Sequence, residues 1–297
     1  MTFTKTASSE HKIMKGHFFD GFMRVVFTVC ACVSILAVVI ICIYMFVGGF
    51  PAIREIGIID FLFGTKWKPS SGYYGIFPMI VGSIVITGIA IIVGVPIGIL
   101  CSVFMAYYCP AWLYKFIKPA INLLAGIPSI VYGYFGLMAL VPAMKSIFGG
   151  SGKSMLTAGI LLGIMILPTI IGVSETSLRA VTPSYYEGSL ALGATHERSV
   201  FAAVLPAAKS GILAGVILGV GRAIGETMAV AMIAGNQPRL PESITDGIRT
   251  LTSNIVIEMG YAAQGLHRDA LIATAVVLFV FILIINLCFS ILKRRKD

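Results

Sequence analysis

Charged residues are scarce in this sequence. Only 12% of its 297 residues are Asp, Glu, Lys or Arg, whereas 58% are hydrophobic. A soluble domain has about a quarter charged residues, so this shortage excludes an ordinary soluble protein. The charges are also clustered, and the five longest uncharged runs begin after Arg24, Lys68, Lys118, Lys153 and Asp269. Each run is long enough for a helix of about 20 residues to cross a bilayer.

Histidine and cysteine are also few, with four and six residues. No His lies in a long uncharged run, which argues against an intramembrane hydrolase, because its nucleophile would lack an imidazole base. The cysteines show no zinc-ligand spacing, so we expect no metal site and no cofactor. Gly152, Lys153 and Ser154 match the end of an ATP-binding GxxxxGK[ST] loop, but position 147 is Ile rather than Gly. We therefore expect a chain that is not an enzyme, with any ATPase in a separate partner.

What the sequence does contain is a series of long apolar runs. Lipid offers no partner for an unpaired backbone group, so these runs are expected to be helices. The first is too long for a cleaved signal peptide and has no cleavage site, so we expect it to be a span. We predict an all-α, polytopic transmembrane bundle with about six spans, at Val25–Val47, Phe77–Tyr107, Pro119–Val141, Ser154–Val173, Ile212–Ala234 and Ala270–Leu292.

The distribution of Lys and Arg sets the expected orientation. These residues are more frequent in the segments on the side of both termini, and the chain ends with a KRRK run from Lys293. The positive-inside rule therefore puts both termini in the cytoplasm. Residues 1–24 are then a cytoplasmic segment, residues 25–292 the membrane domain and residues 293–297 a basic tail. The net charge of +9 fits contact with anionic lipid headgroups rather than nucleic acid.

The cytoplasmic loop at residues 175–211 has the signals of two short helices. Ser184 followed by Glu187 is a capping box, which predicts a helix from Tyr185 to Leu192 that stops at Gly193. Thr195 can cap a second helix, which we expect to end before Pro206. The loop is thus predicted to be a helical hairpin with a glycine turn.

This hairpin resembles the coupling loop of ATP-binding-cassette importer permeases, whose pattern is EAA, three residues, Gly, nine residues, Ile, one residue and Leu-Pro. The sequence departs from that pattern where Gly188 and Ser189 replace the two Ala and where Ala203 replaces the Ile. The resemblance implies docking into a groove on a cytoplasmic ATPase. The alternative is a capped surface hairpin without a partner. The residues that match or surround the pattern are Ser184, Glu187, Gly188, Gly193, Leu205 and Pro206.

The fifth predicted span combines small residues with two charges. Gly211, Gly215 and Gly219 repeat every four residues, which favours close helix packing. Arg222 and Glu226 are four apart, which predicts one shared helix face. One interpretation is a packing clip in which the charges neutralise each other. The other is a substrate pathway, in which the Arg fork binds an oxyanion.

The carboxylate would also select among oxyanions. Near neutral pH phosphate still carries a proton that it can donate to Glu226, whereas sulfate carries none and would be repelled. This argument favours phosphate over sulfate. The alternatives are a permease for another oxyanion, such as molybdate or sulfate, and an ATPase-independent channel.

Four segments resemble phosphate-specific permeases of the PstC type. They are RAIGETMAV from Arg222, with the Gly235–Asn236 pair after it, and the segments FLFGTKW from Phe61, LAGIPSIVYGYFGL from Leu124 and MGYAAQGLHRDAL from Met259. The resemblance implies a type I importer in the cell membrane, with a second PstA-type permease, two PstB-type ATPases and an external PstS-type phosphate-binding protein. Ser129 and Tyr132, beside Pro128, are further candidates for the pathway.

Overall fold

The computed structural model describes the backbone of residues 4–294 and the side chains of residues 20–288 and of Ile291. The predicted basic tail, 293–297, lies largely outside the described residues. The chain divides into two units, residues 1–48 and residues 49–297. Helix α1 (Thr4–Ile56) runs through the boundary between them. In the first unit the apolar side chains of the predicted span are mostly exposed, as in a helix that faces lipid.

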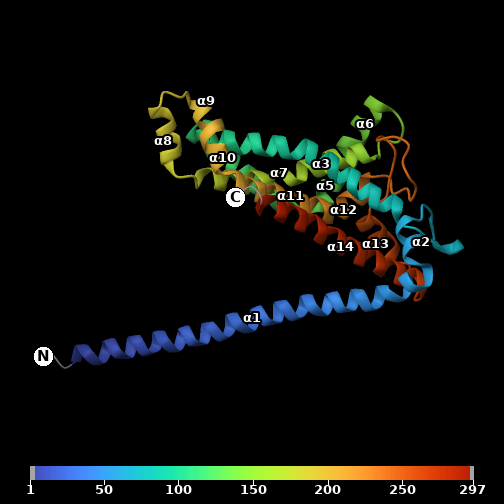
Figure 1. Cartoon of the computed structure of the whole chain (residues 1–297), viewed down its shortest axis with the longest axis horizontal. Helices are drawn as coiled ribbons and strands as arrows, with labels where there is room; N and C mark the ends of the chain where they lie inside the picture. The colour runs from blue at the N-terminus through green and yellow to red at the C-terminus, as the bar shows by residue number, and fades with distance from the viewer. Residues whose placement is uncertain (1–3, 295–297) are drawn as a thin grey trace. The chain divides into compact units, whose positions relative to one another are not determined.

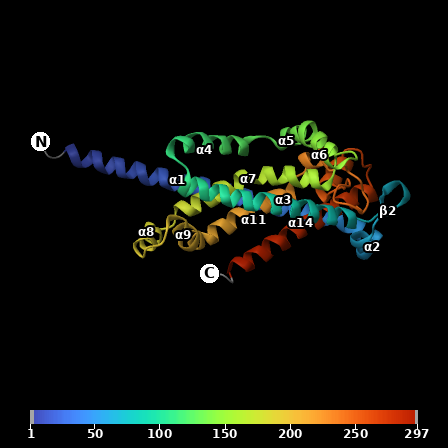
Figure 2. The ribbon, with the colours of Figure 1, turned by 90° about the horizontal axis from the view of Figure 1, so that it is seen from above.

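Three long helices form the centre of the second unit: α3 (Phe77–Val103), α7 (Met155–Arg179) and α11 (Lys209–Gly225). They run along one another (Figures 1 and 2), and α7 packs against both α3 and α11. Their main core contains Ile86, Leu161, Ile166 and Ile170, each with 1% exposure or less. Side chains of α7 are buried over most of its length, so this helix is the central helix of the bundle.

The third predicted span is broken. Helix α4 (Ala111–Gly126) ends before Ile127 and Pro128, which both have extended backbone, and α5 (Ser129–Phe135) starts afresh. A π-helical turn at 136–140 and α6 (Val141–Phe148) follow. A continuous helix over Pro119–Val141 is therefore wrong. Proline lacks an N–H and disfavours helix at the residue before it, which explains the break.

Shorter elements close both ends of the second unit. At one end lie α2 (Ile58–Phe63), the antiparallel pair β1 (Trp67–Lys68) and β2 (Tyr73–Tyr74), and α13 (Leu251–Met259), packed beside the start of α14 (Leu266–Arg294). At the other end α8 (Pro183–Ala191), α9 (His196–Ser199) and α10 (Leu205–Ala207) project from the bundle (Figure 1). Two more π-helical turns occupy 104–108 and 200–204.

Five helices of the described part are long and apolar enough to cross a membrane. The fifth predicted span, Ile212–Ala234, is divided between α11 and the short helix α12 (Met228–Ile233). A bend of 70° at residue 208 separates α11 from the hairpin arm before it. The all-α multispan fold is confirmed, and the exceptions are the two broken spans and a small β-hairpin.

Candidate substrate site and coupling hairpin

The fifth predicted span breaks between its two charges. Helix α11 ends at Gly225, Glu226 has extended backbone (φ −67°, ψ 134°), and α12 begins at Met228. The prediction that Arg222 and Glu226 share one helix face is therefore wrong. The ion pairs of the described residues do not include one between them, so the packing clip is not formed either.

Each charge has a separate local partner. Arg222 Nη1 donates to Thr169 Oγ1 at 3.4 Å, so the arginine points to α7 one residue beyond Pro168. Glu226 Oε1 accepts from the backbone N–H groups of Thr227 (3.1 Å) and Ala229 (3.3 Å). The glutamate thus caps the first turn of α12, where a carboxylate satisfies free N–H groups and favours the helix dipole. Both side chains are half-buried.

Hydroxyl side chains surround Glu226. Glu226 lines a small cavity of about 10 Å³, close to the space that one water needs. Thr252 also donates to the Glu226 carbonyl at 2.9 Å. Sequence reasoning missed the hydroxyl residues, because they lie on α3 and at the start of α13, far from Glu226 in the chain. The polar residues lining the cavity are Ser83, Thr87, Glu226, Thr250 and Thr252.

The other two pathway candidates lie at the break in the third span. Ser129 is the first residue of α5 and is half-buried. The Tyr132 side chain is buried, and its hydroxyl donates across the break to the Leu124 carbonyl at 2.8 Å. At Gly133 a Cβ would lie 2.9 Å from Ala229 Cα. Helix α5 therefore lies directly against α12, and the two broken spans meet at their short halves.

The predicted glycines lie where α11 meets α7. A Cβ at Gly211 would overlap the Ser177 side chain, and a Cβ at Gly219 would lie 2.9 Å from Ile170 Cγ1. At Gly215 the same atom would be 3.2 Å from Ser174 Oγ. Small residues at these positions are what allows the two backbones to approach so closely.

The first helix of the hairpin begins two residues earlier than predicted. Helix α8 starts at Pro183 after Thr182, whose side chain makes no capping hydrogen bond, so Ser184 lies inside the first turn. The capping box of Ser184 and Glu187 is therefore wrong. Proline is favoured at a first helical position because its missing N–H has no intrahelical partner to lose there.

The turn of the hairpin follows the prediction. Gly193 has a φ of 85°, and its N–H donates to the Leu190 carbonyl, while Ala194 N–H donates to the Ser189 carbonyl. This pattern is a Schellman motif, which requires a left-handed residue at the position of the glycine. The Thr195 hydroxyl accepts from Arg198 N–H at 3.3 Å and caps α9, as predicted.

The second arm does not end before Pro206. Helical backbone continues from α9 through the π-helical turn at 200–204 to Ala207, and Leu205 N–H donates to the Val200 carbonyl, five residues back. The expected stop at Pro206 is wrong. In a regular α-helix the proline ring would clash with the carbonyl four residues earlier. The wider π turn before Pro206 shifts the carbonyls out of that position, so the helix continues through the proline.

Aromatic contacts join the hairpin to the bundle. The Tyr186 hydroxyl lies 2.6 Å from His196 Nδ1, and the His196 ring packs edge-on against Tyr108 at 4.7 Å between centroids. The outer face of the hairpin is open: Glu187, Gly188 and Leu192 are exposed, and Leu192 is 91% exposed.

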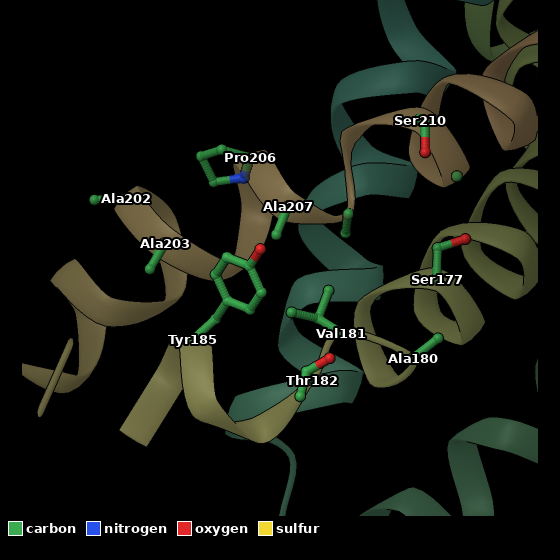
Figure 3. Close-up of a pocket in the computed structure, with 12 residues that line it drawn as sticks. Ser177, Ala180, Val181, Thr182, Tyr185, Ala202, Ala203, Pro206, Ala207 and Ser210 are labelled. Carbon is green, nitrogen blue, oxygen red and sulfur yellow. The ribbon is translucent and has the colours of Figure 1, made fainter. Parts of the chain in front are cut away.

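A groove of about 690 Å³ separates the hairpin from the ends of α7 and α11. Figure 3 shows Tyr185 of α8 pointing toward Ala203 and Ala207 on the second arm. Pro206 also lines the groove.

A buried carboxylate connects α7 to α4. Glu175, 1% exposed, accepts from Lys118 Nζ at 2.6 Å, Tyr114 Oη at 2.7 Å and Arg179 Nε at 2.9 Å. The Arg179 guanidinium also lies over the Tyr114 ring at 4.8 Å. Sequence reasoning placed Glu175 at the start of a loop, whereas it lies inside the last turns of a helix.

A second buried carboxylate lies at the opposite end of the bundle. Glu258 Oε1 accepts from Arg249 Nη1 at 2.5 Å, and Oε2 accepts from Trp67 Nε1 at 2.8 Å and lies 2.9 Å from His267 Nε2. Burial alone would raise the pKa of Glu258. The hydrogen bonds from Trp67, His267 and Arg249 outweigh burial and hold the pKa below its usual value. The side chain is therefore a carboxylate at neutral pH.

Comparison with known proteins identifies the family. The family of the binding-protein-dependent transport system inner membrane component matches residues 94–297. The chain belongs to this family. Among curated members of similar sequence, the probable ABC transporter permease protein YqgH of Bacillus subtilis strain 168 is 39% identical over 92% of this chain and 91% of its own. The phosphate transport system permease protein PstC of Xylella fastidiosa strain 9a5c is 34% identical over 88% and 86%, and PstC of Haemophilus influenzae is 35% identical over 81% and 82%.

Solved structures agree with this family at the level of the fold. A chain of the MetNI methionine ABC transporter, in an inward-facing conformation, aligns over 75% of this chain with a TM-score of 0.56 and 20% identity. A chain of a bacterial alginate ABC transporter aligns over 88% with a TM-score of 0.60 and 15% identity. This binding-protein-dependent permease is thus a multi-pass membrane subunit of an ABC importer, and its resemblance to the PstC type is confirmed.

Proposed function

We propose that this chain carries inorganic phosphate across the cell membrane, as a non-enzymatic permease subunit driven by a separate ATPase. Its relatives from Xylella fastidiosa and Haemophilus influenzae are named as phosphate permeases. The partners that complete this importer are a PstA-type second permease, two PstB-type ATPases and an external PstS-type binding protein. Both termini then face the cytoplasm. The hairpin, with Glu187, Gly193 and Leu205, contacts an ATPase.

The observation that carries the proposal is the break between Arg222 and Glu226. Because Glu226 caps α12 instead of pairing with Arg222, the guanidinium is not neutralised by it. Of its five N–H donors, one is used by Thr169 among the described contacts. The remaining donors can bind two oxygens of a tetrahedral anion at once. An arginine at mid-span is costly to insert, which favours a role facing protein or a polar path.

Glu226 supplies the discrimination between anions. Both of its capping hydrogen bonds fall on Oε1, which leaves Oε2 for a proton-bearing oxygen of phosphate. Sulfate has no such proton at neutral pH, so the carboxylate repels it. This supports phosphate over sulfate as the substrate.

The test is uptake of labelled phosphate by proteoliposomes that contain the assembled importer and its binding protein. Arg222→Gln should lower uptake by about 10- to 100-fold, the effect of losing hydrogen bonds to a charged group. Glu226→Gln keeps an oxygen that can cap α12 and should make sulfate a better inhibitor of phosphate uptake. Arg239→Gln, at an exposed arginine outside the site, is the matched control. Normal uptake by Arg222→Gln with the complex intact would refute the proposal.

A further inference from the structure

The half-helix α12 is held at both of its ends by residues 248–252. At its start, Thr252 Oγ1 donates to the Glu226 carbonyl at 2.9 Å. At its end, Ile248 N–H donates to the Ala234 carbonyl at 2.8 Å. Arg249 Nε donates to the Asn236 carbonyl at 3.1 Å. Residues 248–252, which lead into the first turn of α13, therefore contact both ends of α12, and we call this segment the clamp.

The backbone of Gly235 and Asn236, which follow α12, is conformationally restricted. Asn236 has a positive φ of 53°, unusual for a residue other than glycine, and its Nδ2 donates to the Ala231 carbonyl at 2.6 Å. A Cβ at Gly235 would lie 2.8 Å from Gly247 Cα. The backbone touches Gly247, the residue just before the clamp, so a displacement of the clamp and of Gly247 moves the end of α12.

Arg249 fastens the clamp to the rest of this end of the bundle. Besides Asn236, it binds Asn254 Oδ1 at 3.0 Å and Glu258 Oε1 at 2.5 Å, both through Nη1. The Arg249 and Glu258 side chains are 12% and 6% exposed. Glu258 in turn is bound by Trp67 of β1 and lies against His267 of α14. A single arginine thus connects the end of α12 to three other elements.

A helix as short as α12, with six residues, is not stable by itself, so its tertiary contacts decide its position. Its apolar side chains Ala229, Val230 and Ile233 are buried in the main core, which holds α12 against the bundle. The hydrogen bonds at its two ends fix the orientation of α12, because a hydrogen bond requires an aligned donor and acceptor. Glu226 lies at the start of this helix, so the orientation of α12 sets the position of its carboxylate.

We propose that Arg249 and Glu258 are positioning residues for transport, which fix α12 and thereby hold the Glu226 carboxylate at the place where it selects the anion. This proposal rests on the proposed function of Glu226. Neither residue touches the substrate. Their effect passes through Asn236 and the clamp, and a displacement of about 1 Å at a binding group is enough to cost about 100-fold in a positioned reaction.

The experiment compares Arg249→Lys, Arg249→Met and Glu258→Gln in the reconstituted importer. Lysine keeps a charge for Glu258, but a single ammonium cannot also reproduce the Nε contact with Asn236. We expect about tenfold faster amide hydrogen exchange in residues 226–236 for both Arg249 variants, the effect of one lost charged hydrogen bond. Sulfate should inhibit phosphate uptake more strongly in all three variants, as in Glu226→Gln. Arg239→Met, at an exposed arginine bound to Gln237, should change neither readout.

Two outcomes overturn the positioning role. One is unchanged hydrogen exchange in residues 226–236 when Arg249 is replaced. The other is faster exchange without any change in sulfate inhibition, in an importer where Glu226→Gln does change it. The double variant Glu226→Gln, Arg249→Lys should show no more sulfate inhibition than Glu226→Gln alone, since both act on the same carboxylate. Failure of the proposed function is recognised separately, because Glu226→Gln by itself would then leave sulfate inhibition unchanged.

Discussion

Replacing Gly219 by Ala should weaken the packing of α11 on α7. The new Cβ would lie 2.9 Å from Ile170 Cγ1 and 3.2 Å from Cδ1, closer than ordinary van der Waals contact. Ile170 has no room to move away, because on its other side a Cβ at Gly98 of α3 would lie only 2.8 Å from its Cγ2. The isoleucine is fully buried between two glycines, and its branched side chain has few rotamers.

The size of the effect follows from this geometry. Overpacking a tight core by one methyl group costs about 1–3 kcal/mol, and the upper half of that range applies where the neighbour cannot yield. Gly221 is the matched control on the same helix, because a Cβ there meets nothing within 4 Å. Gly221→Ala should be neutral or stabilising by up to about 1 kcal/mol, since Ala is the better helix former.

Thermal unfolding of the purified complex in detergent measures this difference. The midpoint should fall for Gly219→Ala and stay level or rise for Gly221→Ala. A second arm uses Ile170→Ala, which leaves a cavity and costs about 2–5 kcal/mol by itself. The double variant of Ile170→Ala and Gly219→Ala should be more stable than the sum of the two effects, because the methyl group then occupies freed space. Equal midpoints for the two glycine variants, or strict additivity, would refute the reasoning.

The two buried carboxylates give further tests. Replacing both Lys118 and Arg179 by Met leaves Glu175 with Tyr114 as its described partner, and should destabilise the protein by about 3–5 kcal/mol in thermal unfolding. Glu175→Gln should cost less, because the two cations are 30% and 47% exposed and can turn to water; the opposite order would contradict the burial argument. Because the pKa of Glu258 is lowered on folding, its stabilisation is complete above the usual Glu pKa of about 4.3 and is lost as pH falls through the lower folded value. The difference in melting temperature between the native protein and Glu258→Gln should therefore shrink below about pH 4.3, and a constant difference down to pH 3 would contradict the assignment.

The sequence was sufficient for features that depend on local pattern. Uncharged runs identified the spans, because burial in lipid excludes charge from nearly every position of a helix. The four-residue glycine spacing indicated a packing surface, and in the structure Gly211 and Gly219 face α7. At the hairpin, Gly193 and Thr195 were predictable because left-handed turns and helix caps are set by one or two residues.

The breaks in the spans could not be found from hydropathy, which does not distinguish a broken helix from a whole one. Pro128 was a visible signal for the break in the third span, because proline disfavours helix at the residue before it. The break at Glu226 depends on contacts of its own side chain and on Thr252, which is 26 residues away. No periodic pattern contains that pairing.

The buried clusters around Glu175 and Glu258 could not be predicted from the sequence for a related reason. Lys118 and Tyr114 bind Glu175 across 57 and 61 residues, and Trp67 binds Glu258 across 191. Such pairs exist only once the helices are assembled. A lone Glu near the end of an apolar run is equally consistent with a solvated loop, which is how Glu175 was interpreted.

The interruption after Gly225 makes the spacing of two opposite charges adjustable. On one unbroken helix, side chains four residues apart keep a separation of about 6 Å however the helix tilts. Here Arg222 is joined to α7 by its hydrogen bond to Thr169 and by the glycine contacts of α11, whereas Glu226 is joined to α13 through Thr252 and begins the segment that packs on α5. Any sliding of one group of helices past the other lengthens or shortens the gap between cation and carboxylate. On the proposed function, the fit between these two charges and an anion therefore depends on the arrangement of the whole bundle, which a single straight helix could not provide.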